Sequence, residues 1–110
     1  MPNQDLIDRY FAGMRNRDVD ALLALFTEDA TFILPDGREF EGRDAISEMY
    51  RLLFANSRPN PSPRPGIVGT DCIATEVETE LPDGSKRYTA NFFHFSEDGL
   101  LRRVHSYRRG

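Results

Sequence analysis

The chain has 110 residues, of which 39% are hydrophobic and 29% are charged, as expected for one soluble globular domain. Its net charge of −4, with arginines interleaved among acidic residues, argues against a nucleic-acid-binding surface. The single cysteine excludes an internal disulfide, no apolar run approaches the ~20 residues of a membrane helix, and residues 1–5 lack the pattern of a secretory signal. We therefore expect a cytoplasmic protein that neither binds nucleic acid nor enters a membrane.

The first quarter of the chain predicts two helices. Apolar residues recur at helical spacing in a first helix that should end near Asn16: Leu6, Ile7, Tyr10, Phe11 and Met14. Asp18 is a good N-cap for the second helix, because its carboxylate can accept a hydrogen bond from a free backbone N–H. The same periodicity continues there through four apolar residues: Val19, Leu22, Leu23 and Phe26.

A strand, a tight turn and a third helix are predicted next. Residues 30–34 are rich in β-branched and aromatic types, which favours a strand. The turn is formed by Pro35, Asp36 and Gly37. Residues 38–41 can then pair back on the strand, and Gly42 or Asp44 opens the third helix. The apolar stripe of that helix is Ala45, Ile46, Met49, Tyr50 and Leu53.

The second half of the chain is rich in strands. Four prolines between residues 56 and 66 preclude a helix or a central strand, so we interpret this segment as a loop at the rim of the fold. Loops of this length are often functional, although a stiff connector explains it equally well. Three long strands follow at Ile67–Leu81, Lys86–Phe95 and Leu100–Arg108. The first exceeds the usual strand length, which predicts a bulge or bend near Gly69.

This order of elements predicts an α+β fold, in which three N-terminal helices pack on the concave face of a strongly curved antiparallel sheet. Two motifs, FTEDATF at residues 26–32 and EGRDAI at residues 41–46, carry a resemblance to a known family. With the element order, they resemble the SnoaL-like and ketosteroid-isomerase-like branch of the nuclear transport factor 2-like superfamily. The resemblance runs from Leu6 to Tyr107 and specifies the fold more than the chemistry, because this superfamily includes isomerases, cyclases, dehydratases and non-enzymes.

The resemblance implies two hydrogen-bond donors for a substrate oxygen. Tyr10 matches the donor tyrosine of the isomerase, and Tyr50 matches the tyrosine that supports it. Asn91, four residues before Phe95, stands where the isomerase has a protonated aspartate, and its amide can donate the same hydrogen bond without a shifted pKa. Tyr10 and Asn91 are therefore the catalytic candidates. Tyr10 can equally anchor its hydroxyl to a backbone carbonyl, since a buried tyrosine hydroxyl needs a partner in either case.

The general base of the isomerase is missing at the matching position. Leu34 stands before the turn proline where the isomerase has an aspartate, and leucine cannot accept a proton. Asp36 is an alternative base, but a turn aspartate commonly caps its own backbone. Histidine is the side chain whose unperturbed pKa lies nearest neutrality, yet strand alternation places both His94 and His105 on the face opposite the cavity. A bulge near His105 would reverse that placement and make it an acid or base candidate.

The residues expected to line the cavity are mostly apolar. They are Met14, Phe26, Phe32, Leu34, Met49, Tyr50, Phe54, Phe93, Val104, Ser106 and Arg108. Phe26 takes the position of a further tyrosine in the hydrogen-bond network of the isomerase. The four arginines near the C-terminus, at 102, 103, 108 and 109, are better explained as solvated side chains of a final strand than as a phosphate site.

No cofactor and no metal are predicted. The sequence has no paired cysteines, no His-x-His and no HExxH motif, and no glycine-rich phosphate loop follows a strand. The lone Cys72 lies in a predicted strand and is better explained as a small buried hydrophobe than as a nucleophile.

We expect a small-molecule ligand and a homodimer. The outer face of the sheet would expose Tyr88, Phe92 and Tyr107 beside both histidines, which favours pairing of two sheets. Two functions fit these features. The first is an isomerase-, cyclase- or lyase-type enzyme that binds a small apolar carbonyl compound but lacks the usual aspartate base. The second is a non-catalytic ligand-binding or dimeric association domain.

Overall fold

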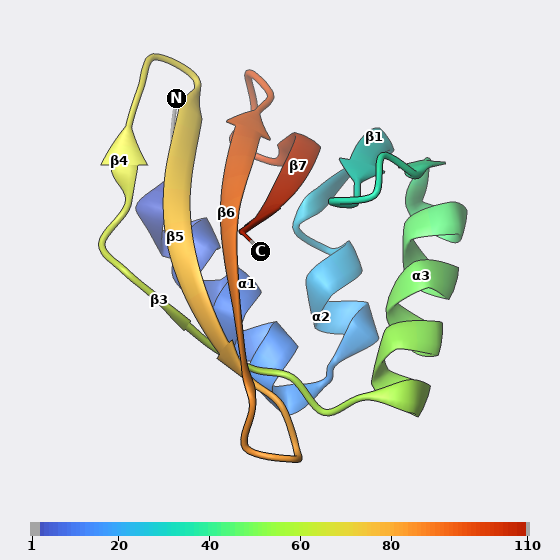
Figure 1. Ribbon diagram of the computed structural model, residues 1–110. Helices are drawn as coiled ribbons and strands as arrows, with labels where there is room; N and C mark the ends of the chain where they lie inside the picture. Colours follow the sequence, from blue (N-terminus) through green and yellow to red (C-terminus); the bar gives the residue numbers. More distant parts are fainter. Residues whose placement is uncertain (1–2, 110) are drawn as a thin grey trace.

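The computed structural model describes residues 3–109, which form three helices and seven strands. In chain order they are α1 (Gln4–Asn16), α2 (Val19–Leu23), β1 (Phe26–Ile33), β2 (Glu39–Glu41), α3 (Arg43–Asn56), β3 (Asn60–Pro63), β4 (Ile67–Val68), β5 (Cys72–Glu80), β6 (Lys86–Phe95) and β7 (Leu101–Arg109). Figure 1 shows the long strands β5, β6 and β7 in front of α1, with α2 in contact with both α1 and α3.

The sheet is curved, open and mixed. Its strand order is β2-β1-β7-β6-β5-β3, and β4 pairs with β5. The expectation of a purely antiparallel sheet is wrong at one position, because β1 runs parallel to β7. A parallel neighbour requires a long crossover between the two strands. The stretch from β2 to β6 supplies that crossover, so the first and last strands meet in the middle of the sheet.

The start of the chain folds as its capping residues predict. The Asn3 side chain accepts a hydrogen bond from the Leu6 N–H at 3.1 Å, and Asp18 accepts one from the Ala21 N–H at 3.1 Å, which confirms Asp18 as an N-cap. Gly13 lies against Leu22, and an added Cβ there would come within 2.9 Å of the leucine side chain. The glycine therefore allows α1 and α2 to approach closely enough to bury Leu22.

The second helix is shorter than the periodicity predicts. α2 ends at Leu23, and Phe26 is the first residue of β1, so the assignment of Phe26 to the helix is wrong. Leu25 and Phe26 are 4% and 0% exposed, which shows that the chain turns into the core at this point. A short apolar run fits a buried strand as well as a helix, and burial decides between them here.

The proline-rich segment contains an edge strand, which corrects its interpretation as a loop alone. β3 pairs antiparallel with β5, with Pro61 opposite Thr79 and Pro63 opposite Val77. The prolines occupy alternate positions, while Arg64 at the other parity donates its N–H to the Glu76 carbonyl at 2.8 Å. An edge strand tolerates proline wherever the missing N–H would face away from its neighbour.

The predicted long strand from Ile67 to Leu81 is two strands. β4 pairs with β5, so that Val68 lies opposite Ile73. The chain reverses between them at residues 69–71, where the Gly69 N–H donates to the Cys72 carbonyl at 2.7 Å. The irregularity expected near Gly69 is therefore a complete reversal of the chain.

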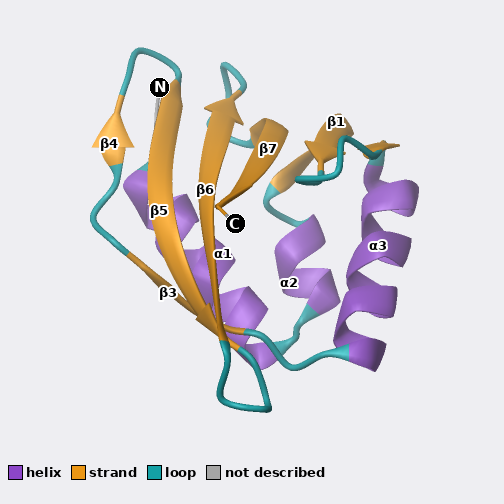
Figure 2. Ribbon diagram, viewed as in Figure 1, coloured by secondary structure: helices purple, strands orange, loops and turns teal. Residues whose placement is uncertain are grey.

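Figure 2 shows the helical layer beside the sheet. One apolar core joins the two layers. The helices contribute Leu6, Ile7, Tyr10, Phe11, Leu22, Ile46, Met49 and Tyr50 to it. The strands contribute Phe26, Ala30, Phe32, Ile73, Val77, Phe93, Phe95, Leu101 and Val104. Because these side chains come from both layers, the helices and the sheet are held in fixed positions relative to one another.

Candidate functional site

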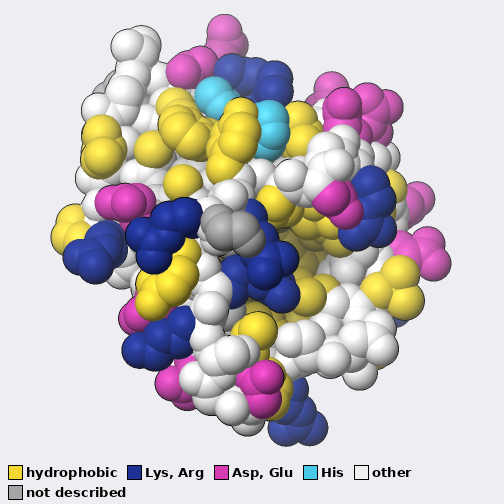
Figure 3. All heavy atoms as spheres, viewed as in Figure 1, with side chains coloured by type: hydrophobic (Ala, Val, Ile, Leu, Met, Phe, Trp, Pro, Cys, Tyr) yellow, Lys and Arg dark blue, Asp and Glu magenta, His cyan; other side chains and the backbone are white. Residues whose placement is uncertain are grey.

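A cavity of about 760 Å³ lies between α1, α3, the turn after β1, the edge strand β3 and one face of β5, β6 and β7. Figure 3 shows a hollow with hydrophobic side chains at its floor and Lys or Arg side chains beside it. A cavity of this size falls in the range of small-molecule sites, which are mostly apolar with a few polar groups.

Two buried tyrosines meet at the cavity wall. The hydroxyls of Tyr10 on α1 and Tyr50 on α3 are 2.8 Å apart, and the two residues are 3% and 1% exposed. Burial raises the pKa of Tyr10 to about 12, although the hydrogen bond from Tyr50 offsets part of that rise. Burial and the neighbouring Tyr10 raise the pKa of Tyr50 well above its ordinary value. Both phenols therefore stay protonated at neutral pH.

Either hydroxyl can be the donor of this hydrogen bond. Only one of the two phenol protons lies in the bond, so the other is free to point at another acceptor. Tyr10 also packs edge-on against Phe93 at 5.1 Å between ring centroids, which fixes the ring.

Rows of side chains across β5, β6 and β7 change from apolar to basic along the strands. The rows are Ile73–Phe93–Val104, then Thr75–Asn91–Ser106, then Val77–Thr89–Arg108, and finally Thr79–Arg87. The first row is buried beneath the floor of the cavity. Asn91, Ser106, Arg108 and Arg87 from the later rows line the cavity itself. The site thus has an apolar inner end and a basic outer end.

Nine of the thirteen residues predicted for the site line the cavity. They are Tyr10, Met14, Phe32, Leu34, Met49, Tyr50, Asn91, Ser106 and Arg108. Tyr10 and Asn91 are thus lining residues of one cavity, although their sequence positions are far apart.

The other four predicted residues lie behind the cavity wall. Phe26, Phe93 and Val104 are each 0% exposed and belong to the core. Phe54 stacks on Tyr50 with 5.8 Å between ring centroids and an interplanar angle of 17°, so it supports the tyrosine from outside the cavity. Strand parity predicted the face on which Phe93 and Val104 lie, but it did not predict how deeply they are buried.

Several lining residues were missed by the sequence analysis. Arg87 and Thr89 share the alternation of Asn91 on β6, so the sequence did contain a signal for them. Pro59 and Pro61 also line the cavity, and no signal marked them because the edge strand β3 was not expected.

The described residues lining the cavity offer no free general base. Leu34, which stands where the resemblance places the aspartate base of the isomerase, lines the cavity and cannot accept a proton. Asp36 lies at the rim, accepts hydrogen bonds from the Arg38 N–H at 3.0 Å and from Arg38 Nε–H at 2.8 Å, and has its pKa lowered by these contacts. A carboxylate stabilised in this way is a weak base.

Both histidines lie outside the cavity, as strand alternation predicts. His105 stacks on Tyr107 with ring centroids 4.2 Å apart and pairs with Phe92 across the strands. The pKa of His94 is lowered by partial burial and by the charges of Arg102 and Arg103. Neither histidine is among the residues that line the cavity.

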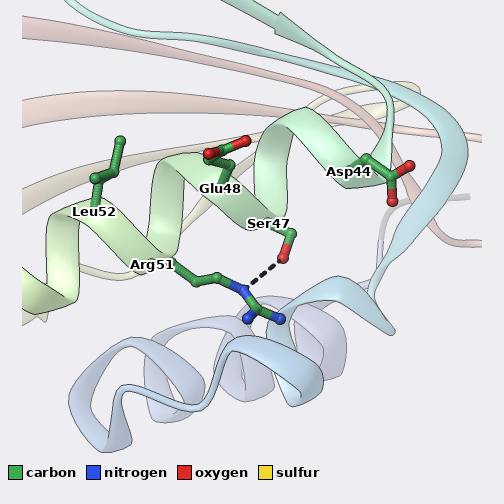
Figure 4. A pocket seen from close by; sticks show the side chains of 5 residues that line it. All are labelled: Asp44, Ser47, Glu48, Arg51 and Leu52. Carbon is green, nitrogen blue, oxygen red and sulfur yellow. Dashed lines mark hydrogen bonds between the residues drawn. The ribbon is translucent and has the colours of Figure 1, made fainter.

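A second, shallower depression of about 290 Å³ lies along α3. It is lined by Asp44, Ser47, Glu48, Arg51 and Leu52. In Figure 4 these side chains project from successive turns of the helix, and the only drawn hydrogen bond is from Arg51 Nε–H to Ser47 Oγ at 3.1 Å. This is the solvated face of a helix and holds no convergent set of polar groups.

Residues 3–109 contain no group of three or more His, Cys, Asp or Glu side chains placed to hold a metal ion. Among the described helices, none is both long and apolar enough to cross a membrane.

Comparison with known proteins agrees with the geometry of the fold. The profile of the SnoaL-like domain matches residues 7–104. No curated protein sequence matches the chain significantly.

Solved structures share the fold at low sequence identity. A protein assigned as a ketosteroid isomerase from Kribbella flavida superposes with a TM-score of 0.85 and 20% identity, over 96% of this chain and 76% of that chain. A protein assigned as a polyketide cyclase from Sinorhizobium meliloti has a TM-score of 0.84 and 21% identity, over 93% of both chains. A computationally designed binder of 17-OHP has a TM-score of 0.84 and 16% identity, over 96% of this chain and 89% of that chain. At these identities the likeness establishes the fold alone.

Proposed function

We propose that this chain, which belongs to the SnoaL-like domain family of the nuclear transport factor 2-like superfamily, binds a small apolar carbonyl compound in the cavity. In this arrangement the helices occupy the concave side of the curved sheet, and the cavity is the space left between them. The observation that carries the proposal is the buried pair of Tyr10 and Tyr50 hydroxyls, 2.8 Å apart, at the wall of an otherwise largely apolar cavity.

The ligand oxygen accepts hydrogen bonds from Tyr10 and Asn91. Tyr50 donates to the Tyr10 oxygen, and Tyr10 in turn donates to the ligand, so the two phenols polarise each other. The Asn91 side-chain amide on β6 supplies a second donor. Both donors are neutral at pH 7, so they stabilise partial negative charge on the oxygen without carrying a charge themselves, at donor–acceptor distances of about 2.7–3.1 Å.

Binding without isomerisation is the form of this function that the residues favour. Isomerisation needs a group that removes a proton beside the carbonyl, and the matching position is Leu34. Asp36 is held by Arg38 and does not replace it. A cyclase- or lyase-type reaction remains the second candidate, because two donors that stabilise an oxyanion also lower the barrier of such reactions when the base is a water or a ligand group. The names of the three structural neighbours include both catalysis and binding.

Substitution of Tyr10 by phenylalanine tests this proposal. With 4-nitrophenolate as an oxyanion mimic, we expect Tyr10→Phe to weaken binding by about 1.5–3 kcal/mol, since one charge-assisted hydrogen bond is lost. Tyr107→Phe removes the same hydroxyl from the outer face of the sheet and should leave the affinity unchanged. Equal affinities for wild type and Tyr10→Phe would remove Tyr10 from the site, and an absence of any binding by the wild type would contradict the proposal.

The same chain is proposed to form a homodimer through the outer face of the sheet. Tyr88, Phe92 and Tyr107 are 38%, 38% and 49% exposed there, and the rings of Phe92 and Tyr107 pack edge-on at 5.6 Å. One face that pairs with its own copy gives a closed two-fold assembly. Size-exclusion chromatography with light scattering should report a dimer at micromolar concentration and a monomer for Phe92→Lys. A strictly monomeric wild type would contradict the homodimer.

A further inference from the structure

Two arginines lie at the outer end of the cavity. Arg87 on β6 and Arg108 on β7 both line it. Thr89 is the partner of Arg108 across the strands, and Arg87 is two residues from Thr89 on the same face. Diagonal neighbours of this kind have Cα atoms about 7–8 Å apart, which lets two long side chains reach one group between them.

Neither arginine is in an ion pair within residues 3–109, whose ion pairs are Arg38–Asp36, Lys86–Glu78 and Arg102–Asp71. The Nε of Arg87 is buried and has no hydrogen-bond partner in the described part of the chain. A buried donor left without a partner is costly, because folding removes the water that it would otherwise bind. This guanidinium is therefore placed where an acceptor from outside the chain would satisfy it.

The outward-facing arginines of the same sheet differ in this respect. Arg102 pairs with Asp71 at 3.2 Å, and the guanidinium of Arg109 lies 4.4 Å from the centroid of the Tyr88 ring. The charged residues that line the cavity are three arginines and one aspartate, although the whole chain has a net charge of −4. Positive charge is thus concentrated at the mouth of the cavity in an acidic protein.

The spacing along β6 relates this basic end to the two neutral donors. Asn91 and Arg87 are four residues apart on one strand, or about 13 Å at the usual rise per residue. An arginine side chain shortens that span as it reaches inward. A ligand that uses both ends of the site therefore carries its carbonyl and its charged group at opposite ends of a body two or three fused rings long.

We propose that the ligand is an apolar keto acid, whose carboxylate is bound by Arg87 and Arg108 while its carbonyl oxygen points toward Asn91 and Tyr10. This inference rests on the proposed function, since it adds a second anchoring point to the same cavity. A carboxylate accepts two parallel N–H bonds from one guanidinium, which makes arginine well suited to it. The ionic end then sits near solvent at the exposed Arg108, and the apolar body fills the dry interior.

The test compares an acid with its neutral analogue. The probes are an acetylnaphthoate with its ketone and carboxylate at opposite ends of the two rings, and the corresponding carboxamide. Titration calorimetry should show that the wild type binds the acid at least about tenfold more tightly than the amide. Because Arg108 is exposed, added salt should weaken binding of the acid and leave the amide unaffected.

Three variants identify the arginines responsible. Arg87→Gln and Arg108→Gln should each weaken binding of the acid by about 10- to 100-fold and change the amide by less than about threefold. Arg109→Gln is the matched control, because it removes the same charge from the neighbouring residue on the outer face of β7, and it should change neither affinity. Retained amide binding in the first two variants shows that their cavity is still folded.

The contrary outcomes are distinct. Equal affinities of the wild type for the acid and the amide would overturn this inference and leave the proposed function standing. An equal loss in Arg108→Gln and Arg109→Gln would also overturn it, because a long-range charge effect would then explain the result. Binding of neither probe to the wild type would contradict the inference and the proposed function together. If Arg87→Gln fails to fold, it binds neither probe. In that case the affinities of Arg108→Gln decide whether the inference stands, because the exposed side chain of Arg108 is not required for folding.

Discussion

The two faces of β6 and β7 are built from the same strands and differ in almost every physical property. Phe93 is 0% exposed, while its neighbour Phe92 is 38% exposed. The inner face carries the deep apolar row, the neutral donors and two arginines without ion pairs among the described residues. The outer face carries both histidines, exposed aromatic rings and arginines that have partners on the protein. Residue type therefore predicts little here, and strand parity predicts most.

The two faces suit two different kinds of binding. On the inner face, side chains converge on a space of about 760 Å³, which suits a small molecule. On the outer face, exposed aromatic rings lie side by side, and we propose that they pair with another sheet. A substitution on one face should therefore change the property that depends on that face, and the matched substitution on the other face should leave that property unchanged.

The largest expected effect is on stability. Phe93→Ala should lower the free energy of unfolding by about 3–5 kcal/mol, because it leaves a cavity in the close-packed row with Ile73 and Val104. Phe92→Ala should lower it by less than about 1 kcal/mol, because the ring is partly solvated. Urea denaturation at a concentration where the chain is monomeric measures both. Similar losses for the two variants would contradict the assignment of the faces.

A smaller effect is expected at alkaline pH. The pKa of Tyr10 is about 12 in the folded protein and about 10 in the unfolded chain, so the unfolded chain ionises first. Stability should therefore be full below pH ~10 and fall by roughly 2–3 kcal/mol as the pH approaches 12. Tyr10→Phe should reduce this slope in pH-dependent denaturation, whereas Tyr107→Phe on the outer face should retain it. An unchanged slope in Tyr10→Phe would argue that its hydroxyl is solvated.

The outer face should show a weaker dependence at acidic pH. The lowered pKa of His94 means that the unfolded chain takes up its proton first as the pH falls below about 6.5. Stability is then present above that pH and is lost gradually below it, and His94→Gln should remove part of the loss. The effect is small because His94 is only partly buried. A wild type that becomes more stable on acidification from pH 7 to 5, when His94→Gln does not, would contradict the lowered pKa of His94 in the folded protein.

The smallest effect is expected at the rim of the cavity. Asp36→Asn frees Arg38 from its only ion pair among the described residues. We expect the acetylnaphthoate to bind slightly more tightly, by less than about threefold, because exposed charges are well screened. Loss of binding of both the acid and the amide would instead identify Asp36 as a ligand-contacting group that the account has missed.

The sequence predicted the helices, the turn after the first strand and the strand parity, because these depend on local spacing and on residues such as Asp18 and Gly37. It failed where several local structures fit equally well. Phe26 fitted a helix or a strand, and the alternate prolines of β3 hid an edge strand that only its pairing with β5 reveals.

Prediction of the site residues from the sequence was limited in the same way. The resemblance pointed to Asn91, and strand parity pointed to Ser106 and Arg108. The depth of Phe93 and the contact of Pro61 with the cavity depend on how the layers pack. The role of Arg87 was also not evident from its position in the sequence. Its buried and unpartnered Nε is a property of the folded chain alone.

The most direct measurement is the carbonyl stretching frequency of a bound ketone. Acetylnaphthalene with an isotope label at its carbonyl carbon would be bound to the wild type and to Tyr10→Phe, and infrared difference spectra would be recorded. The account predicts a frequency well below that in an apolar solvent for the wild type, and a return toward the solvent value in Tyr10→Phe. A frequency in the wild type equal to that in the apolar solvent would contradict a carbonyl group hydrogen-bonded inside the cavity.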